Sequence, residues 1–134
     1  MKKNLNKTSL LACLVLALPL CAVANPIQDS YRTPAKQENA AFKDFSVAAG
    51  EKLYNTKINE LSCASCHTSS PTNTGKHVKT NKVILPLSPS ANPKRFTEAA
   101  TVEKWFKRNC NDVLSRACTA QEKGDFIAYV LSAK

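Results

Sequence analysis

Cys63-Ala64-Ser65-Cys66-His67 is the stretch of sequence that decides the fold of this chain. A C-x-x-C-H run is typical of c-type haem attachment, because two thiols can add to the two vinyl groups of haem while the next imidazole binds the iron. We therefore predict one covalent haem c, held by Cys63 and Cys66, with His67 as the proximal iron ligand.

Two other uses of a C-x-x-C pair are weaker. A zinc site needs two further ligands at matching spacing, and the sequence offers no good pair except Cys110 and Cys118. A thioredoxin-like redox pair needs a strand-to-helix setting, which the flanking sequence lacks.

The first 24 residues have the three parts of an export signal. Residues 1–7 carry three Lys and no acid, residues 10–20 are almost unbroken apolar, and Ala22-Val23-Ala24 is the pattern that signal peptidase accepts. We predict cleavage after Ala24, export to a bacterial periplasm, and no membrane anchor, because the apolar run is short for a membrane span. An uncleaved anchor and a lipoprotein modified at Cys13 are the weaker alternatives.

The composition after cleavage indicates one small domain. From Asn25 onward the chain has 110 residues, 16 basic and 10 acidic side chains, and four of the six Cys. It is too apolar for a wholly disordered chain and too short for two domains. Export, together with the lack of any recognition motif, argues against nucleic-acid binding.

The pattern predicts an all-α fold that wraps around the haem, with an extended lead-in over 25–39 and a cytochrome c domain over 40–134. A short helix over 35–42 is the alternative for the C-terminal end of the lead-in. Helices are expected over 46–55, 101–110 and 119–132, with Ser46 and Thr119 as N-caps. Residues 68–93 are expected to be a loop, which a small domain tolerates if it wraps a large cofactor. Gly50 and Gly124 each lie inside a helix, as if two helices cross closely there.

The helix over 101–110 carries the residues expected on the haem side. Val102, Trp105, Phe106 and Asn109 recur at i, i+3, i+4 and i+7, which is one helical stripe. We expect Trp105 and Phe106 to pack on the haem, together with Leu85, because a chain with this much loop otherwise buries little apolar surface.

The second axial ligand stays open at this point. Methionine, the usual distal ligand of electron-carrying cytochromes, is excluded because the only Met is Met1. His77 would give a closed, low-spin electron carrier, but it lies only ten residues after His67. Asn109 ends an apolar stripe and could bind iron through its amide oxygen, or could simply cap its own helix. Lys76, Lys79 or water are the remaining candidates.

The stretch from Cys63 to the C-terminus resembles the sphaeroides haem protein (SHP) family of small, high-spin c-type cytochromes. The matching segments are CASCH (63–67), PLSPSANP (86–93), VEKWF (102–106), RNCNDVL (108–114), CT (118–119) and EKGD (122–125).

This resemblance implies a variant of the class I cytochrome c fold, and it also implies which residue is the second axial ligand of the iron. Members of the family use an asparagine as distal ligand, followed at once by a disulfide-bonded cysteine, and the residues here are Asn109 and Cys110. Cys110 and Cys118 are also the only cysteines left after haem attachment in an oxidising compartment, so we predict that they pair. The family implies no iron ligand at His77.

Two functions follow as expectations. The first is a haem protein whose Asn109 ligand leaves on reduction, so that oxygen or nitric oxide binds, with possible oxidoreductase activity on that gas. The resemblance implies electron exchange with a dihaem cytochrome c. The second is a plain electron shuttle with a permanent His77 ligand. A basic rim would steer an acidic redox partner in either case; its members are Lys76, Lys79, Lys82, Lys94, Arg95, Lys104, Lys107 and Arg108.

Overall fold

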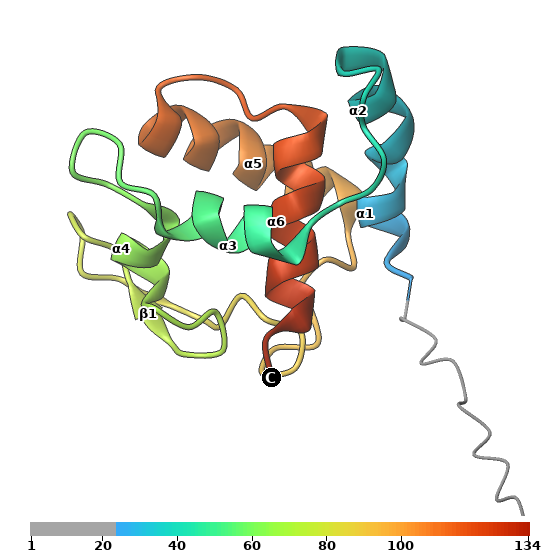
Figure 1. Cartoon of the computed structure of the whole chain (residues 1–134). Coiled ribbons are helices and arrows are strands. Elements are labelled where there is room, and N and C mark those ends of the chain that lie inside the picture. The colour runs from blue at the N-terminus through green and yellow to red at the C-terminus, as the bar shows by residue number, and fades with distance from the viewer. Residues whose placement is uncertain (1–23) are drawn as a thin grey trace, which may run out of the picture.

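Helices dominate the part of the chain that the computed structural model describes, residues 24–134 (Figure 1). The predicted signal peptide lies outside these residues, except for Ala24. The elements are α1 (Pro26–Ser30), α2 (Arg32–Glu38), α3 (Val47–Asn55), α4 (Cys63–His67), β1 (Gly75–Lys76), β2 (Val83–Ile84), α5 (Ala99–Leu114) and α6 (Ala120–Ser132). The predicted all-α class is confirmed. None of the helices in residues 24–134 has the length and hydropathy to cross a membrane.

The centre of the fold is the crossing of α3 and α6, which depends on a glycine. A Cβ atom on Gly50 would lie 1.9 Å from the backbone oxygen of Asp125 and 2.8 Å from the Cβ of Tyr129. Only a residue without a side chain allows this approach. The predicted close crossing is therefore confirmed at Gly50. Gly124 serves a different contact, because its missing Cβ leaves room for the ring of Phe45.

Side-chain caps fix where α3 and α6 begin. The Ser46 hydroxyl accepts a hydrogen bond from the Ala49 N–H at 3.2 Å. At α6 the Thr119 hydroxyl accepts from the Glu122 N–H at 3.1 Å, and the Glu122 carboxylate accepts from the Thr119 N–H at 2.9 Å. Each cap satisfies N–H groups that the first helical turn leaves free. Both predicted helix starts are confirmed.

The lead-in was predicted to be extended, and this prediction is wrong. Residues 26–38 form two short helices, because the Asn25 side chain caps the N–H groups of Ile27 and Gln28 and a proline follows it at the first helical position. Apolar side chains of the two helices and of the residue between them are buried in the same core as α6; they are Ile27, Tyr31 and Ala35. Tertiary packing, more than local propensity, holds such short helices.

Helix α5 is longer than predicted and turns a different face inward. It runs to Leu114 and ends at Ser115, which adopts the left-handed conformation with φ 57°. Its buried residues recur every four positions: Val102, Phe106, Cys110 and Leu114. The expected stripe is therefore divided, since Val102 and Phe106 enter the core whereas Trp105 and Asn109 lie on the exposed side.

The segment between α4 and α5 is irregular, as predicted, apart from a two-stranded antiparallel hairpin in which Gly75 pairs with Ile84 and Lys76 with Val83. Backbone and hydroxyl contacts fasten the rest of the segment. The Ser88 N–H donates to the Pro71 carbonyl at 2.8 Å, and the buried Ser88 hydroxyl donates to the Ala133 carbonyl beyond α6 at 2.8 Å. The long loop is thereby tied to the end of the last helix.

Candidate haem site

The C-x-x-C-H run forms its own short helix, α4. A reciprocal cap starts it: the Ser62 hydroxyl accepts from the Ser65 N–H at 3.2 Å, and the Ser65 hydroxyl accepts from the Ser62 N–H at 3.0 Å. Cys63 and Cys66 then project from one helical turn, and His67 follows directly as the last helical residue. The two thiols and the imidazole that c-type attachment needs therefore share a single rigid element.

The chemistry of these side chains fits a haem. Cys63 and Cys66 carry free thiols, whereas the other two cysteines of residues 24–134 are paired with each other. Burial, together with the nearby positive charge of Arg95, lowers the pKa of the His67 imidazole to about 4. The neutral ring is the form that binds a metal. In residues 24–134 no three His, Cys, Asp or Glu side chains gather as a metal cluster, so the zinc alternative has no donor set there.

Tyr54 anchors the end of this helix. Its side chain has 0% exposure, and its hydroxyl donates to the carbonyl oxygens of His67, at 3.0 Å, and Thr68, at 2.8 Å. Burial raises the pKa of Tyr54, so the phenol remains a donor across the physiological range. Tyr54 comes from α3, and it thus fixes the backbone of the proximal ligand to the central helix crossing. Sequence reasoning missed this residue, because a single tyrosine in a helix gives no signal of its partner.

Two backbone features set the position of α4 relative to the hairpin. Thr68 ends α4 with φ 66° and ψ 178°, a positive φ that residues other than glycine rarely adopt. A Cβ atom on Gly75 would lie 2.1 Å from the carbonyl oxygen of Cys66 and 2.9 Å from the Cα of His67. Strand β1 can therefore lie directly against the haem-attachment helix only because residue 75 is glycine.

Asn109 and Trp105 lie one turn apart on the exposed side of α5. Trp105 is 43% exposed, which is unusual for the largest apolar side chain, and Asn109 is exposed as well. Among the hydrogen bonds of residues 24–134, none involves the Asn109 amide group. The alternative that Asn109 caps its own helix is wrong, because α5 continues for five more residues and Ser115 is the C-cap.

Two of the apolar side chains predicted to pack on the haem are exposed. Leu85 is 61% and Trp105 43% exposed, so neither is covered by the described part of the chain. Phe106, which was also predicted to pack on the haem, is buried in the protein core. Its ring packs against those of Tyr31 and Phe126, with ring centroids 6.2 and 5.6 Å away.

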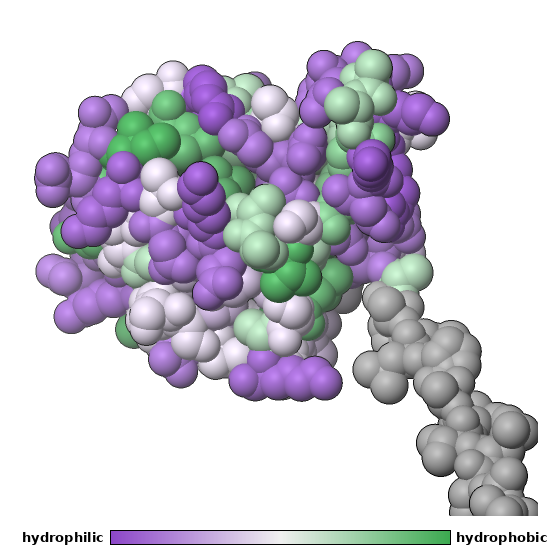
Figure 2. All heavy atoms as spheres, in the orientation of Figure 1, coloured by the Kyte–Doolittle hydropathy of each residue, from purple (hydrophilic) through white to green (hydrophobic). Residues whose placement is uncertain are grey.

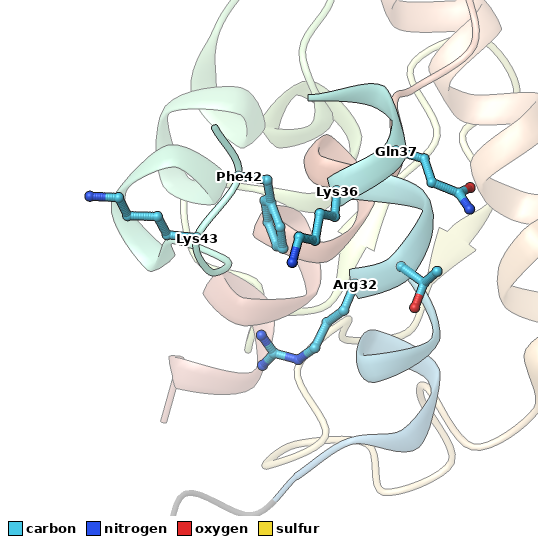
Figure 3. A pocket seen from close by; sticks show the side chains of 6 residues that line it. Arg32, Lys36, Gln37, Phe42 and Lys43 are labelled. Atoms are coloured by element: carbon cyan, nitrogen blue, oxygen red, sulfur yellow. The ribbon is translucent and has the colours of Figure 1, made fainter. Parts of the chain in front are cut away.

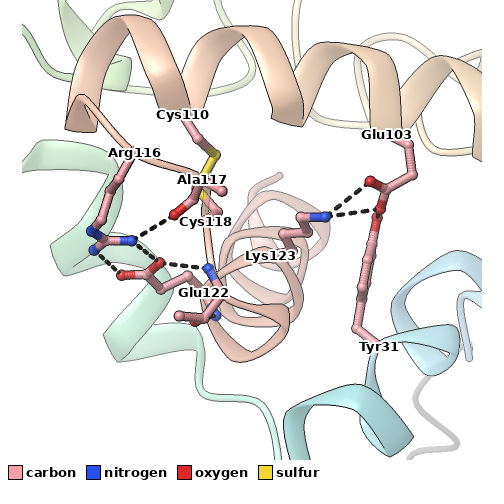
Figure 4. The surroundings of a disulfide bond; sticks show 9 residues. Tyr31, Glu103, Cys110, Arg116, Ala117, Cys118, Glu122 and Lys123 are labelled. Carbon is pink, nitrogen blue, oxygen red and sulfur yellow. Dashed lines mark hydrogen bonds and ion pairs between the residues drawn. A yellow bond between two sulfur atoms is a disulfide. The ribbon is translucent and has the colours of Figure 1, made fainter. Parts of the chain in front are cut away.

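A disulfide follows Asn109 immediately. Cys110 and Cys118 are bonded, with their Cα atoms 5.6 Å apart, as predicted (Figure 4). The bond ties the last third of α5 to the residue before the Thr119 cap of α6. Arg116, in the loop between the two helices, donates to both carboxylate oxygens of Glu122 at 2.6 and 2.7 Å. The turn after Asn109 is therefore fixed at two points.

His77 has a structural role in the tip of the hairpin. Its Nδ1 accepts from the N–H groups of Lys79, at 3.3 Å, and Thr80, at 3.2 Å. The backbone N–H of His77 donates to the Lys82 carbonyl, and the backbone carbonyl of His77 accepts from the Asn81 N–H, both at 2.9 Å. These contacts use one ring nitrogen to close a turn, which makes His77 a poor candidate for the distal iron ligand.

Two shallow pockets lie away from α4. One, of about 360 Å³, is lined by Arg32, Thr33, Lys36, Gln37, Phe42 and Lys43. Figure 3 shows that Lys43 and Gln37 point away from Phe42, and Arg32 is occupied by Asp29 and Asp44. The other, of about 310 Å³, lies between α3 and the ends of α5 and α6. Neither contains a residue of the C-x-x-C-H run.

Comparison with known proteins places this chain in a family. The family model described as "Domain of unknown function (DUF1924)" matches residues 40–130. The chain is 41% identical over 107 residues to cytochrome c'' of Methylophilus methylotrophus, which covers 76% of this chain and 74% of that protein. It is also 51% identical over 69 residues to the cytochrome c-type protein SHP of Cereibacter sphaeroides, covering 52% of this chain and 53% of that protein.

Solved structures give the same relationship. The crystal structure of oxidised cytochrome c'' from Methylophilus methylotrophus aligns with a TM-score of 0.75 and 39% identity, over 81% of this chain and 92% of that chain. The structure of oxidised SHP, described as an oxygen-binding cytochrome c, aligns with a TM-score of 0.69 and 36% identity, over 78% and 91% of the two chains. The expected cytochrome c-like fold is confirmed.

Proposed function

Since the chain belongs to the SHP-like family of high-spin c-type cytochromes, within the family model DUF1924, we propose that it binds a diatomic gas at a haem iron that Asn109 caps reversibly. The chain carries one covalent haem c, as its relatives do. The SHP relative is described as an oxygen-binding cytochrome c, and the solution structure of cytochrome c'' is described in terms of haem-ligand detachment. The proposal transfers both properties to this chain.

The residues of α4 fit the attachment of this group. Cys63 and Cys66 would hold it through thioether bonds, and His67 would supply the proximal nitrogen. When bound, the haem iron supplies a one-electron redox centre and a coordination position that a diatomic gas can take. Tyr54 keeps the His67 backbone in place, because its hydroxyl donates to the carbonyls of His67 and Thr68.

The single observation that carries the proposal is the exposed Asn109 amide. It lies one helical turn after the exposed Trp105 and directly before the disulfide-bonded Cys110. An amide oxygen is a neutral, hard donor, which ferric iron holds better than ferrous iron does. Asn109 would therefore bind in the oxidised protein and leave on reduction. The freed NH2 group can then donate a hydrogen bond to the gas ligand.

The disulfide limits how far Asn109 can travel. Cys110, the next residue, is bonded to Cys118, and Glu122 and Arg116 hold the loop that follows. The side chain can change rotamer, but the helix that carries it stays fixed. We expect the distal pocket to remain formed in both redox states, with access controlled by the electron donor.

The redox step needs a partner protein and an oxidising compartment. We propose that the mature chain begins after Ala24 in the periplasm and exchanges single electrons with an acidic redox protein, such as a dihaem cytochrome c. The proposal is supported by the export pattern of residues 1–24 and by the surplus of basic side chains. Any turnover of the bound gas would draw its electrons from this partner.

Absorption spectra test the gas-binding function. The purified holoprotein is recorded in the ferric and ferrous states, each with and without nitric oxide. We expect a ferrous spectrum that changes on adding nitric oxide at micromolar concentration, and a ferric spectrum that changes more slowly because Asn109 must first leave. A ferrous protein that stays six-coordinate and low-spin and ignores nitric oxide would support the electron-shuttle alternative.

A further inference from the structure

The hairpin formed by residues 75–84 carries an exposed surface with a distinct composition. Three unpaired lysines, Lys76, Lys79 and Lys82, are exposed, and none of them has an acidic side chain within 4 Å in residues 24–134. Val78 is 45% and Val83 70% exposed between them. We call residues 76–83 the lysine hairpin.

The lysine hairpin is held in one shape. Val83 pairs with Lys76 across the two strands, so these side chains share the outer face while Gly75 and Ile84 face inward. The turn at the tip is closed by two hydrogen bonds that His77 Nδ1 accepts from backbone N–H groups. Asn81, with a left-handed φ of 57°, completes this turn. A partner that docks here meets an ordered surface, so little conformational entropy is lost on binding.

The charge around the lysine hairpin has one sign. Residues 61–97 contain five Lys and Arg and no Asp or Glu, so all ten acidic residues of the chain lie outside this segment. At the side of the molecule where Figure 1 places α4 and β1, Figure 2 shows hydrophilic residues interspersed with hydrophobic ones. A field of one sign attracts an oppositely charged protein and raises its association rate.

The lysine hairpin is also directly connected to the haem-attachment helix. Gly75, the residue before Lys76, lies so close to α4 that a Cβ atom there would be 2.1 Å from the Cys66 carbonyl oxygen. A protein seated on the outer face of the hairpin is thus separated from Cys66 by one layer of backbone. A donor seated on the hairpin would therefore lie close to the backbone of the helix that would carry the haem.

We propose that the lysine hairpin is the docking surface for the electron donor, and that this donor presents an acidic rim around an apolar centre that receives Val78 and Val83. The inference rests on the redox part of the proposed function and adds where the partner binds. In the complex one electron passes from the donor to the ferric iron; the donor is oxidised by one electron, the iron becomes ferrous, and no bond to the donor forms.

Charge reversal tests the proposal in the holoprotein. The hairpin variant carries Lys76→Glu, Lys79→Glu and Lys82→Glu. The matched control carries Lys36→Glu, Lys43→Glu and Lys57→Glu, which change the net charge equally at exposed positions outside residues 61–97. Reduction is followed by stopped flow with two probes, a fully reduced acidic flavodoxin and neutral reduced lumiflavin, which senses the haem alone. A third variant with arginine at the three hairpin positions keeps the charge.

We expect the hairpin variant to react with flavodoxin about tenfold more slowly than the native protein at low salt, and the control variant less than twofold more slowly. The arginine variant should keep the native rate, lumiflavin should reduce all four proteins equally, and the differences should vanish near 1 M salt, where the Debye length is about 3 Å. Equal losses in the hairpin and control variants would overturn the proposal, because net charge alone would then explain them.

Two further outcomes also overturn it. If flavodoxin does not reduce the native protein while lumiflavin does, the hairpin does not dock an acidic donor. If the hairpin variant reacts normally with flavodoxin but no longer binds vesicles of anionic phosphatidylglycerol, the surface belongs to a membrane contact. Nitric oxide titration of the same variants measures gas binding at the haem independently of docking. A failure of the proposed gas binding is therefore distinguishable from a failure of the proposed docking surface.

Discussion

Replacing Tyr54 with Phe removes one oxygen atom from the centre of the molecule and nothing else. That hydroxyl is the shared donor to the carbonyls of His67 and Thr68, at 3.0 and 2.8 Å, and the side chain that carries it is fully buried. Leaving buried carbonyl groups without a donor costs about 1–3 kcal/mol. We expect the free energy of unfolding to fall by about 2 kcal/mol, which lowers the Tm of a domain of this size by about 8 °C or more.

Urea unfolding of the holoprotein, followed by haem absorbance and by far-UV circular dichroism, measures this loss. Tyr129→Phe is the matched control, because its ring lies 5.2 Å from that of Tyr54 while no hydrogen bond of its hydroxyl is found in residues 24–134. The control should change the free energy of unfolding by less than about 0.5 kcal/mol. If Tyr54→Phe is no more destabilising than the control, Tyr54 does not anchor the proximal ligand.

Three further predictions concern the helix crossing, the disulfide and the pH dependence of stability. Gly50→Ala should lower the free energy of unfolding by about 1–3 kcal/mol despite the better helix propensity of alanine, because the new methyl would lie 1.9 Å from a backbone oxygen of α6. Urea unfolding measures this loss, and a variant more stable than the native protein would contradict the close crossing of α3 and α6. Replacing Cys110 and Cys118 together with Ser should cost about 2–3 kcal/mol and speed nitric oxide entry into the ferric protein; unchanged entry would show that the disulfide does not restrain the distal side. Hydrogen bonds from Arg116 hold the pKa of Glu122 in the folded protein below its usual value. The ionised Glu122 therefore stabilises the folded state above the unfolded pKa of about 4.3, and this stabilisation is lost as the pH falls through the lower pKa of the folded state. Unfolding curves of Glu122→Gln should therefore lose less stability than the native protein between pH 5 and 3, and identical losses would assign the acid sensitivity to other groups.

Local signals in the sequence were enough for much of the fold. Ser46 and Thr119 are caps that act on residues within their own first turn, so their effect is readable from three or four neighbours. The C-x-x-C-H run is local in the same way. The glycines inside the two predicted helices suggested a close crossing, which is found at Gly50, whereas Gly124 makes room for the ring of Phe45. Asn25 followed by proline is also a local helix-start signal, which would have found the N-terminal helices that were predicted as extended chain.

What the sequence did not predict depends on contacts far apart along the chain. The length of α5 follows from Cys110 and Leu114 reaching the core, and that face is decided by the packing of other elements. Tyr54 meets the C-terminal end of α4 thirteen residues later, which no helical period reveals. His77 was one candidate for the distal iron ligand because imidazole is a strong iron ligand. The sequence did not predict that its Nδ1 accepts hydrogen bonds from two backbone N–H groups of the hairpin tip.

The central claim is that Asn109, and not His77, caps the iron in the oxidised protein and leaves it on reduction. Ferric and ferrous absorption spectra of the holoproteins carrying Asn109→Ala and His77→Ala test it most directly. The account predicts that Asn109→Ala keeps its covalent haem, shows an altered ferric spectrum and binds nitric oxide faster in the ferric state, whereas His77→Ala keeps the native spectra. A low-spin ferric spectrum that becomes high-spin in His77→Ala, with Asn109→Ala indistinguishable from the native protein, would contradict the account.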